Sequence, residues 1–173
     1  DEPQRALELI GDAVRRSRDN AFYLNNLAAA FEKLKRDTEA LICYRHAVSL
    51  KTDYIDALSN LGRMEKQSGR LTEAERVLVR CLELAPDNIE VAGRLAEVLS
   101  LRGKVGEGIT LLQRTLSRHP NGRLSMQLGS LLMLNHQTED AICALEDAAT
   151  ALSELAIVHY NLGNAYAHHQ WLP

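Results

Sequence analysis

Five polar residues recur along this chain at nearly equal spacing. Asn26, Asn60, Arg94, Gln127 and Asn161 follow one another at steps of 34, 34, 33 and 34 residues. Four of the five are amides, although asparagine is only a moderate helix former. A side-chain amide offers both a donor and an acceptor, which suits the backbone of an extended peptide. We call these residues the amide column, and they predict a surface that grips a peptide backbone at each step.

The amide column has a second interpretation. Its side chains could instead bond neighbouring helices or water, and Arg94 interrupts the run of amides. Both interpretations stay open on the sequence alone.

Catalytic and metal-binding patterns are missing from the sequence. His159 and the pair His168-His169 are nine or ten residues apart, which is not the i,i+4 spacing of a helical metal pair. The glycine-rich stretch Gly103–Gly108 lacks the P-loop pattern. The cysteines, three in number, have no spacing typical of a bridge or metal site, so we expect buried thiols. We therefore expect no enzyme activity, no cofactor and no metal.

Charge and hydropathy narrow the class of partner. The chain has 20 basic and 23 acidic residues, a net charge of −3, and neither half is basic. A nucleic-acid partner therefore has little electrostatic support. No apolar run approaches the length of a membrane span, and no signal peptide is visible. We expect a cytoplasmic protein that does not insert into membranes.

The amide column belongs to a wider repeat that must position it. A leucine always follows it, at Leu27, Leu61, Leu95, Leu128 and Leu162. A small residue comes next, at Ala28, Gly62, Ala96, Gly129 and Gly163. A second column of small residues keeps the same register, at Ala6, Ala40, Ala74, Gly108 and Ala141. Small residues at fixed sites let two helix backbones approach closely, and the leucine fills the remaining gap.

The stretch 55–86 shows what one repeat should look like. Its apolar residues follow helical spacing on both sides of Gly69-Arg70, which should end the first helix. Thr72 is placed to cap the second helix. Two short helices with one apolar face each cannot bury those faces alone, so neighbouring repeats should stack.

This pattern resembles the tetratricopeptide repeat, a 34-residue helix–turn–helix with Leu-Gly or Leu-Ala in the first helix and Ala in the second. The resemblance implies an all-α fold, a right-handed superhelical solenoid of antiparallel helix pairs. A single solenoid would span 1–173, with a partial repeat at 1–20 and a further first helix at 156–173. Full repeats would lie at 21–54, 55–88, 89–121 and 122–155. Glu65 departs from the pattern, because the family has an aromatic residue there.

The resemblance also implies that the first helices line a concave groove, and the amide column resembles the asparagine ladder of O-linked N-acetylglucosamine transferases and their SPINDLY relatives. It implies peptide binding by the amide column and by residues at nearby helical offsets. These added candidates are Phe22, Asn25, Arg63, Glu97, Met126, Tyr160 and Asn164. The apolar ones either anchor a ligand side chain or pack between repeats.

Three functional hypotheses follow. The first is a protein–protein interaction scaffold that binds an extended peptide or partner protein in the groove. The second is the substrate-recruiting arm of a larger enzyme such as a glycosyltransferase. The third is self-association through open repeat ends, where Trp171 either plugs the last helix or begins another.

Overall fold

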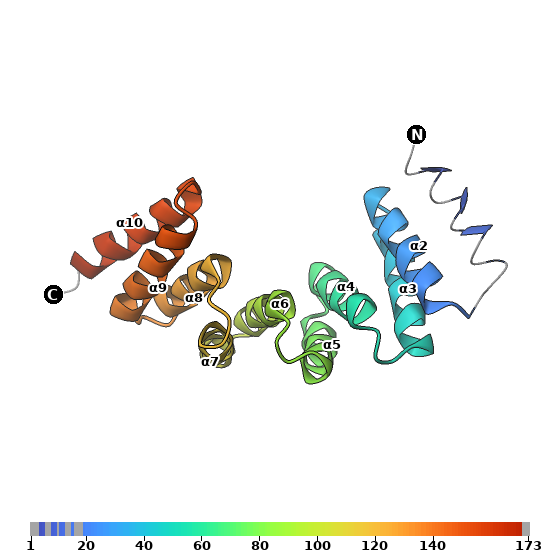
Figure 1. The fold of residues 1–173 in the computed structure, drawn as a ribbon, viewed down its shortest axis with the longest axis horizontal. Coiled ribbons are helices and arrows are strands. Elements are labelled where there is room, and N and C mark those ends of the chain that lie inside the picture. Colours follow the sequence, from blue (N-terminus) through green and yellow to red (C-terminus); the bar gives the residue numbers. More distant parts are fainter. Residues whose placement is uncertain (1–3, 6–7, 10, 13–14, 16–18, 171–173) are drawn as a thin grey trace. The chain divides into compact units, whose positions relative to one another are not determined.

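The computed structural model describes residues 4–5, 8–9, 11–12, 15 and 19–170 (Figure 1). The chain divides into two compact units, unit 1 (Asp1–Pro86) and unit 2 (Asp87–Pro173). Unit 1 contains α2 (Ala21–Lys33), α3 (Asp37–Leu50), α4 (Ile55–Gln67) and α5 (Leu71–Leu84). Unit 2 contains α6 (Ile89–Leu101), α7 (Val105–Leu116), α8 (Gly122–Leu134), α9 (Thr138–Ala151) and α10 (Ala156–Gln170). The described residues form helices and turns without strands, which confirms the all-α prediction.

The helices form pairs, each with a first and a second helix. In unit 1, α2 packs on α3 and α4 on α5, while α3 also packs on α4. In unit 2, the pairs are α6 with α7 and α8 with α9, and α10 packs on α9. The predicted partial repeat at 1–20 lies mostly outside the described residues, as does Trp171. That the two units form one right-handed solenoid stays a prediction.

The same short turn joins the two helices of every complete pair. Its middle residue has a positive φ, at Lys35 (59°), Gly69 (74°), Gly103 (76°) and His136 (59°). The next N–H then reaches back to the first helix, as when Arg70 N donates to Glu65 O at 2.9 Å. This is a Schellman motif, which satisfies carbonyls at the helix end. The prediction that Thr72 caps the second helix is wrong, because α5 begins at Leu71 without a side-chain cap.

Small residues set the distance between paired helices. A Cβ added to Gly62 on α4 would lie 2.5 Å from Leu78 Cγ on α5, and Gly129 on α8 has the same relation to Leu145 on α9. The column leucines Leu27, Leu61, Leu95 and Leu128 are buried beside these contacts. Gly163 on α10 differs, because no described atom lies within 4 Å of an added Cβ.

Glu65 stands where the tetratricopeptide pattern has an aromatic residue, and its side chain forms a buried ion-pair cluster. Its carboxylate is fully buried, accepting from Arg45 Nε at 2.8 Å and from Arg70 Nε at 2.5 Å. Arg45 comes from α3, and Arg70 from the turn after α4. A buried carboxylate is strongly unfavourable unless charges and donors compensate it, and the two guanidinium groups provide both.

A second polar cluster of unit 1 links α2, α3 and α4. Arg63 donates to both oxygens of Glu32, with a shortest distance of 2.5 Å, and we call this contact the Glu32–Arg63 pair. The buried hydroxyl of Tyr44 donates to Glu32 Oε1 at 2.5 Å. Burial, followed by the hydrogen bond to Glu32, raises the pKa of Tyr44 well above its usual value.

The cysteines differ from one another more than expected. Cys81 is buried, and its thiol donates to Ile55 O at 3.6 Å. Cys43 is half-buried, and burial raises its pKa. Cys143 is exposed, so the expectation of three buried thiols is wrong. Cys43 and Cys143 flank the small buried positions of their helices rather than occupying them.

The turn geometry makes a prediction about two glycines. Gly69 has a positive φ and open space around it, so Gly69→Ala should lower the free energy of unfolding by about 1 kcal/mol through backbone strain alone. Gly106 is the matched control, because it lies inside α7 with equally open space. Gly106→Ala should raise the free energy of unfolding by about 0.5–1 kcal/mol. Urea unfolding followed by circular dichroism measures both, and equal effects would contradict the assigned turn.

The Tyr44 cluster predicts a loss of stability in alkali. The raised pKa means that Tyr44 stays protonated in the folded state while it ionises in the unfolded state near pH 10. Its contribution to stability is therefore complete below pH 10 and is lost as the pH rises further. When the pH is raised from 8 to 11, the free energy of unfolding of Tyr44→Phe should fall by about 1 kcal/mol less than that of the wild type. Urea unfolding at both pH values measures this difference. An equal fall in the free energy of unfolding for both proteins would show that Tyr44 does not cause the loss of stability in alkali.

Candidate functional site

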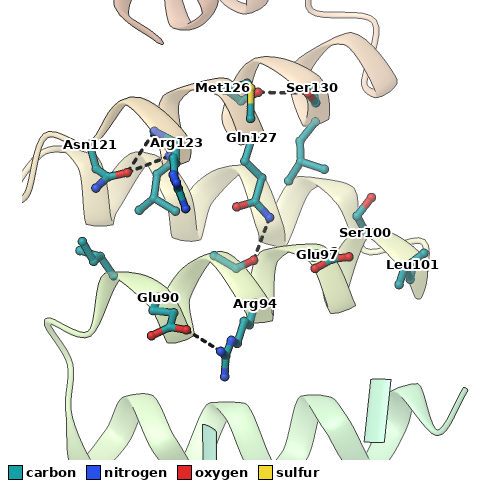
Figure 2. Close-up of a pocket in the computed structure, with 14 residues that line it drawn as sticks. Glu90, Arg94, Glu97, Ser100, Leu101, Asn121, Arg123, Met126, Gln127 and Ser130 are labelled. Carbon is teal, nitrogen blue, oxygen red and sulfur yellow. Dashed lines mark hydrogen bonds and ion pairs between the residues drawn. The ribbon is translucent and has the colours of Figure 1, made fainter. Parts of the chain in front are cut away.

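The first helices of unit 2 form the walls of a groove. Residues of α6 and α8 enclose about 690 Å³, within the range typical of ligand pockets. We call this space the α6–α8 groove (Figure 2). From α6 it is lined by Ile89, Glu90, Gly93, Arg94, Glu97, Ser100 and Leu101. From α8 and its N-cap it is lined by Asn121, Arg123, Leu124, Met126, Gln127, Ser130 and Leu131.

Asparagine caps position the two walls. Asn88 Oδ1 accepts from Val91 N at 3.1 Å at the start of α6. Asn121 Oδ1 accepts from Arg123 N and Leu124 N, each at 3.1 Å, at the start of α8. Such caps satisfy amide groups that the helix itself leaves without partners. They therefore fix where each wall begins.

Gln127 bridges the groove at its centre. Its Nε2 donates to the Gly93 carbonyl at 2.8 Å, which joins α8 to α6 (Figure 2). Gly93 makes this approach possible, because an added Cβ would lie 3.0 Å from Gln127 Oε1 and 2.9 Å from Leu124 Cδ2. The bridging donor leaves the Gln127 carbonyl oxygen at the groove surface.

Unit 1 has a related bridge between its first helices. Asn60 Nδ2 on α4 donates to Asn25 Oδ1 on α2 at 3.3 Å. Asn25 and Gly93 occupy the same place in their repeats, as do Asn60 and Gln127. At both sites the amide column bonds the preceding first helix. These contacts support the interpretation that the amides bond neighbouring helices. Each contact uses only one of the two polar groups of the side-chain amide.

The other members of the amide column are in different surroundings. Asn26 is exposed on α2, and Asn161 is half-buried on α10. Arg94, the exception to the amides, donates to Glu90 Oε1 on its own helix at 2.5 Å. The amide column thus has bridges at two positions, an exposed side chain at one, an ion pair at another and a half-buried side chain at the fifth.

The remaining predicted residues are divided between the groove and other surfaces. Met126 and Glu97 line the α6–α8 groove, while Arg63 is held in the Glu32–Arg63 pair. Phe22 packs against Tyr54 with the two rings tilted by 50° and their centroids 4.8 Å apart, and Lys51 Nζ lies 5.0 Å from the centroid of the Phe22 ring. Tyr160 and Asn164 are exposed on α10. Peptide binding by these residues stays a prediction.

Of the groove residues, Arg94, Glu97, Met126 and Gln127 were predicted site residues, whereas others, including Ser100 and Leu101, were not. The sequence feature that could have identified them is a difference between repeats, not the pattern that the repeats share. Ser100 stands in unit 2 where unit 1 has Glu32, and Ser130 stands where unit 1 has Arg63. The positions that carry an ion pair between α2 and α4 carry two small hydroxyls between α6 and α8.

Histidines in unit 2 make ordinary local contacts. His159 Nε2 lies 2.8 Å from Ser153 O, and His168 Nδ1 lies 3.2 Å from Thr138 Oγ1. The described residues contain no group of three or more His, Cys, Asp or Glu side chains that could hold a metal ion. None of the helices that the structure describes is long and apolar enough to cross a membrane.

Comparisons with known proteins identify the repeats. A tetratricopeptide-repeat family model matches residues 65–131, and another with the same description matches residues 23–54. No curated protein matches the chain in a sequence search. Of the solved structures that match, YrrB is described as a tetratricopeptide-repeat protein with an unusual peptide-binding site. Its TM-score is 0.77 at 20% identity, covering 95% of this chain and 86% of that chain.

Two further solved structures have the same fold. TTC0263 from Thermus thermophilus has a TM-score of 0.73 at 18% identity, covering 95% of this chain and 91% of that chain. MamA from Desulfovibrio magneticus has a TM-score of 0.78 at 20% identity, covering 87% of this chain and 85% of that chain. The chain therefore contains tetratricopeptide repeats, and its helices have the fold of an all-α helical-repeat solenoid.

Proposed function

We propose that the chain is a protein-interaction scaffold that binds an extended peptide segment of a partner protein along its first helices. The observation that carries this proposal is the α6–α8 groove, which combines apolar walls with the Gln127 amide at its centre. A peptide in an apolar groove must find partners for its own backbone groups, because unpaired buried polar groups are costly. The groove offers such a partner in the amide.

The bridges make these amides better binding groups. Gln127 is held by Gly93 O and Asn60 by Asn25 Oδ1, so their side-chain conformations are largely fixed before a ligand arrives. Fixing a side chain in advance reduces the entropy lost on binding. The carbonyl oxygens of both amides then accept from peptide N–H groups. Structural bridging and peptide binding are in this way compatible roles of the same side chain.

The tetratricopeptide repeats support a protein partner, and the peptide-binding site in the description of YrrB supports a peptide ligand. The balanced charge of the chain gives a nucleic-acid partner little support. Further candidate contacts are the exposed Asn26 on α2 in unit 1 and, in unit 2, the exposed Tyr160 on α10. Half-buried Asn161 and exposed Asn164 on α10 are candidates as well. In this proposal the chain has no catalytic role.

The proposal predicts a specific loss of peptide binding. The full chain is used to select ligands from a phage library of random 12-residue peptides, and affinities of selected peptides are measured by fluorescence polarisation. Asn60→Ala/Gln127→Ala removes the bridging amide of each unit and should weaken binding about twofold to tenfold, because one lost hydrogen bond contributes about 0.5–1.5 kcal/mol. Gln113→Ala, at an exposed position on the second helix α7, is the matched control and should bind like the wild type.

Two outcomes would contradict the proposal. One is a library from which no peptide is enriched. The other is a peptide that binds the double variant normally but is lost with Gln113→Ala, which would place the binding surface on the second helices. Circular dichroism melting of each variant verifies that the loss does not come from unfolding.

A further inference from the structure

The α6–α8 groove is open because two columns change residue type between the units. In unit 1 these columns hold the Glu32–Arg63 pair, which crosses from α2 to α4. In unit 2 they hold Ser100 on α6 and Ser130 on α8. Ser130 Oγ donates to Met126 O at 3.0 Å, so its hydroxyl turns back onto its own helix (Figure 2). The side chains that close this position in unit 1 have no equivalent here.

The space left by these serines has apolar walls. Leu131 of α8 lines it on one side and Leu101 of α6 on the other, each next in sequence to one of the serines. Leu101 is 58% exposed, a large value for a leucine. A ligand side chain that covered these groups would remove apolar surface from water, which is favourable in proportion to the area buried.

The groove also carries a cation at one end. Arg123 lies in the first turn of α8, and Figure 2 shows its side chain extending from α8 toward α6. Among the described residues its guanidinium has no ion-pair partner, whereas Arg94 across the groove is paired with Glu90. The backbone amides beside Arg123 are already capped by Asn121. The positive charge available to a ligand at this end is therefore the Arg123 side chain.

We propose that the α6–α8 groove selects peptide segments in which an aliphatic side chain lies about three residues from an acidic residue. Ser130 and Arg123 are about 10.5 Å apart along α8, which an extended peptide spans in about three residues. The aliphatic side chain occupies the space between Ser100 and Ser130, and the carboxylate pairs with Arg123. This inference rests on the proposed function and adds the chemistry of the ligand to it.

The test compares the peptides selected by the wild-type chain and by three variants, using deep sequencing of the random 12-residue library. Wild type should enrich Leu, Ile, Val or Met three or four residues from Asp or Glu, about tenfold over the starting library. Arg123→Glu should reverse the charge preference, lowering the enrichment of acidic residues about twofold to fivefold and raising that of Lys and Arg.

The second variant, Ser100→Glu/Ser130→Arg, introduces the pair that closes unit 1. It should lose the aliphatic preference. The matched control is Thr110→Glu/Gln113→Arg, which adds the same two side chains at exposed positions of α7 and should select the same peptides as the wild type. Circular dichroism melting verifies that all variants fold, and the exposed Arg123→Glu substitution tests the inference even if the double variant is unstable.

The outcomes separate this inference from the proposed function. Peptides that are enriched without an aliphatic–acidic pair, or a preference that Arg123→Glu leaves unchanged, would overturn the inference. The proposed function survives that result if Asn60→Ala/Gln127→Ala still weakens binding. A library from which neither the wild type nor any variant enriches a peptide overturns both.

Discussion

The close approach of paired helices is the constraint on which the rest of this structure depends. At Gly62 and Gly129 a leucine of the second helix lies where a side chain would otherwise project. A larger residue there would push the helices apart and disturb the Schellman turn that joins them. Because this contact recurs at a nearly fixed interval, each first helix presents the same positions to the same neighbours. Residues that are one repeat apart therefore occupy equivalent positions on successive first helices and form columns of side chains.

Those columns explain how similar repeats can have different surfaces. The leucine and small-residue columns hold each pair together, so they vary little in size. Positions on the exposed side of the first helices are free of that constraint. In unit 1 they carry the Glu32–Arg63 pair, and in unit 2 the serines at 100 and 130 leave the α6–α8 groove. The helices beneath are paired in the same way in both units.

The fold was largely predictable from the sequence, because leucine and glycine at one register identify a helix pair directly. The site was less so. The amide column was visible, but a repeat pattern cannot tell that Gln127 bonds Gly93 O while Asn26 stays exposed, since this depends on the neighbouring helix. Burial of Glu65 required knowing that Arg45 and Arg70 converge on it. Ser100 was not predicted because a repeat pattern identifies residues that recur, whereas the groove is lined by residues that differ between repeats.

The chain contains an internal probe for the central claim, that the α6–α8 groove binds the peptide. Its methionines, three in number, are Met64 in the core of unit 1, Met126 in the groove and Met133 against the core of unit 2. We would label the methionine methyl groups with carbon-13 and titrate the full chain with a selected peptide while recording NMR spectra. The account predicts that the Met126 methyl signal shifts while those of Met64 and Met133 stay in place. A bound peptide that leaves Met126 unchanged would contradict it.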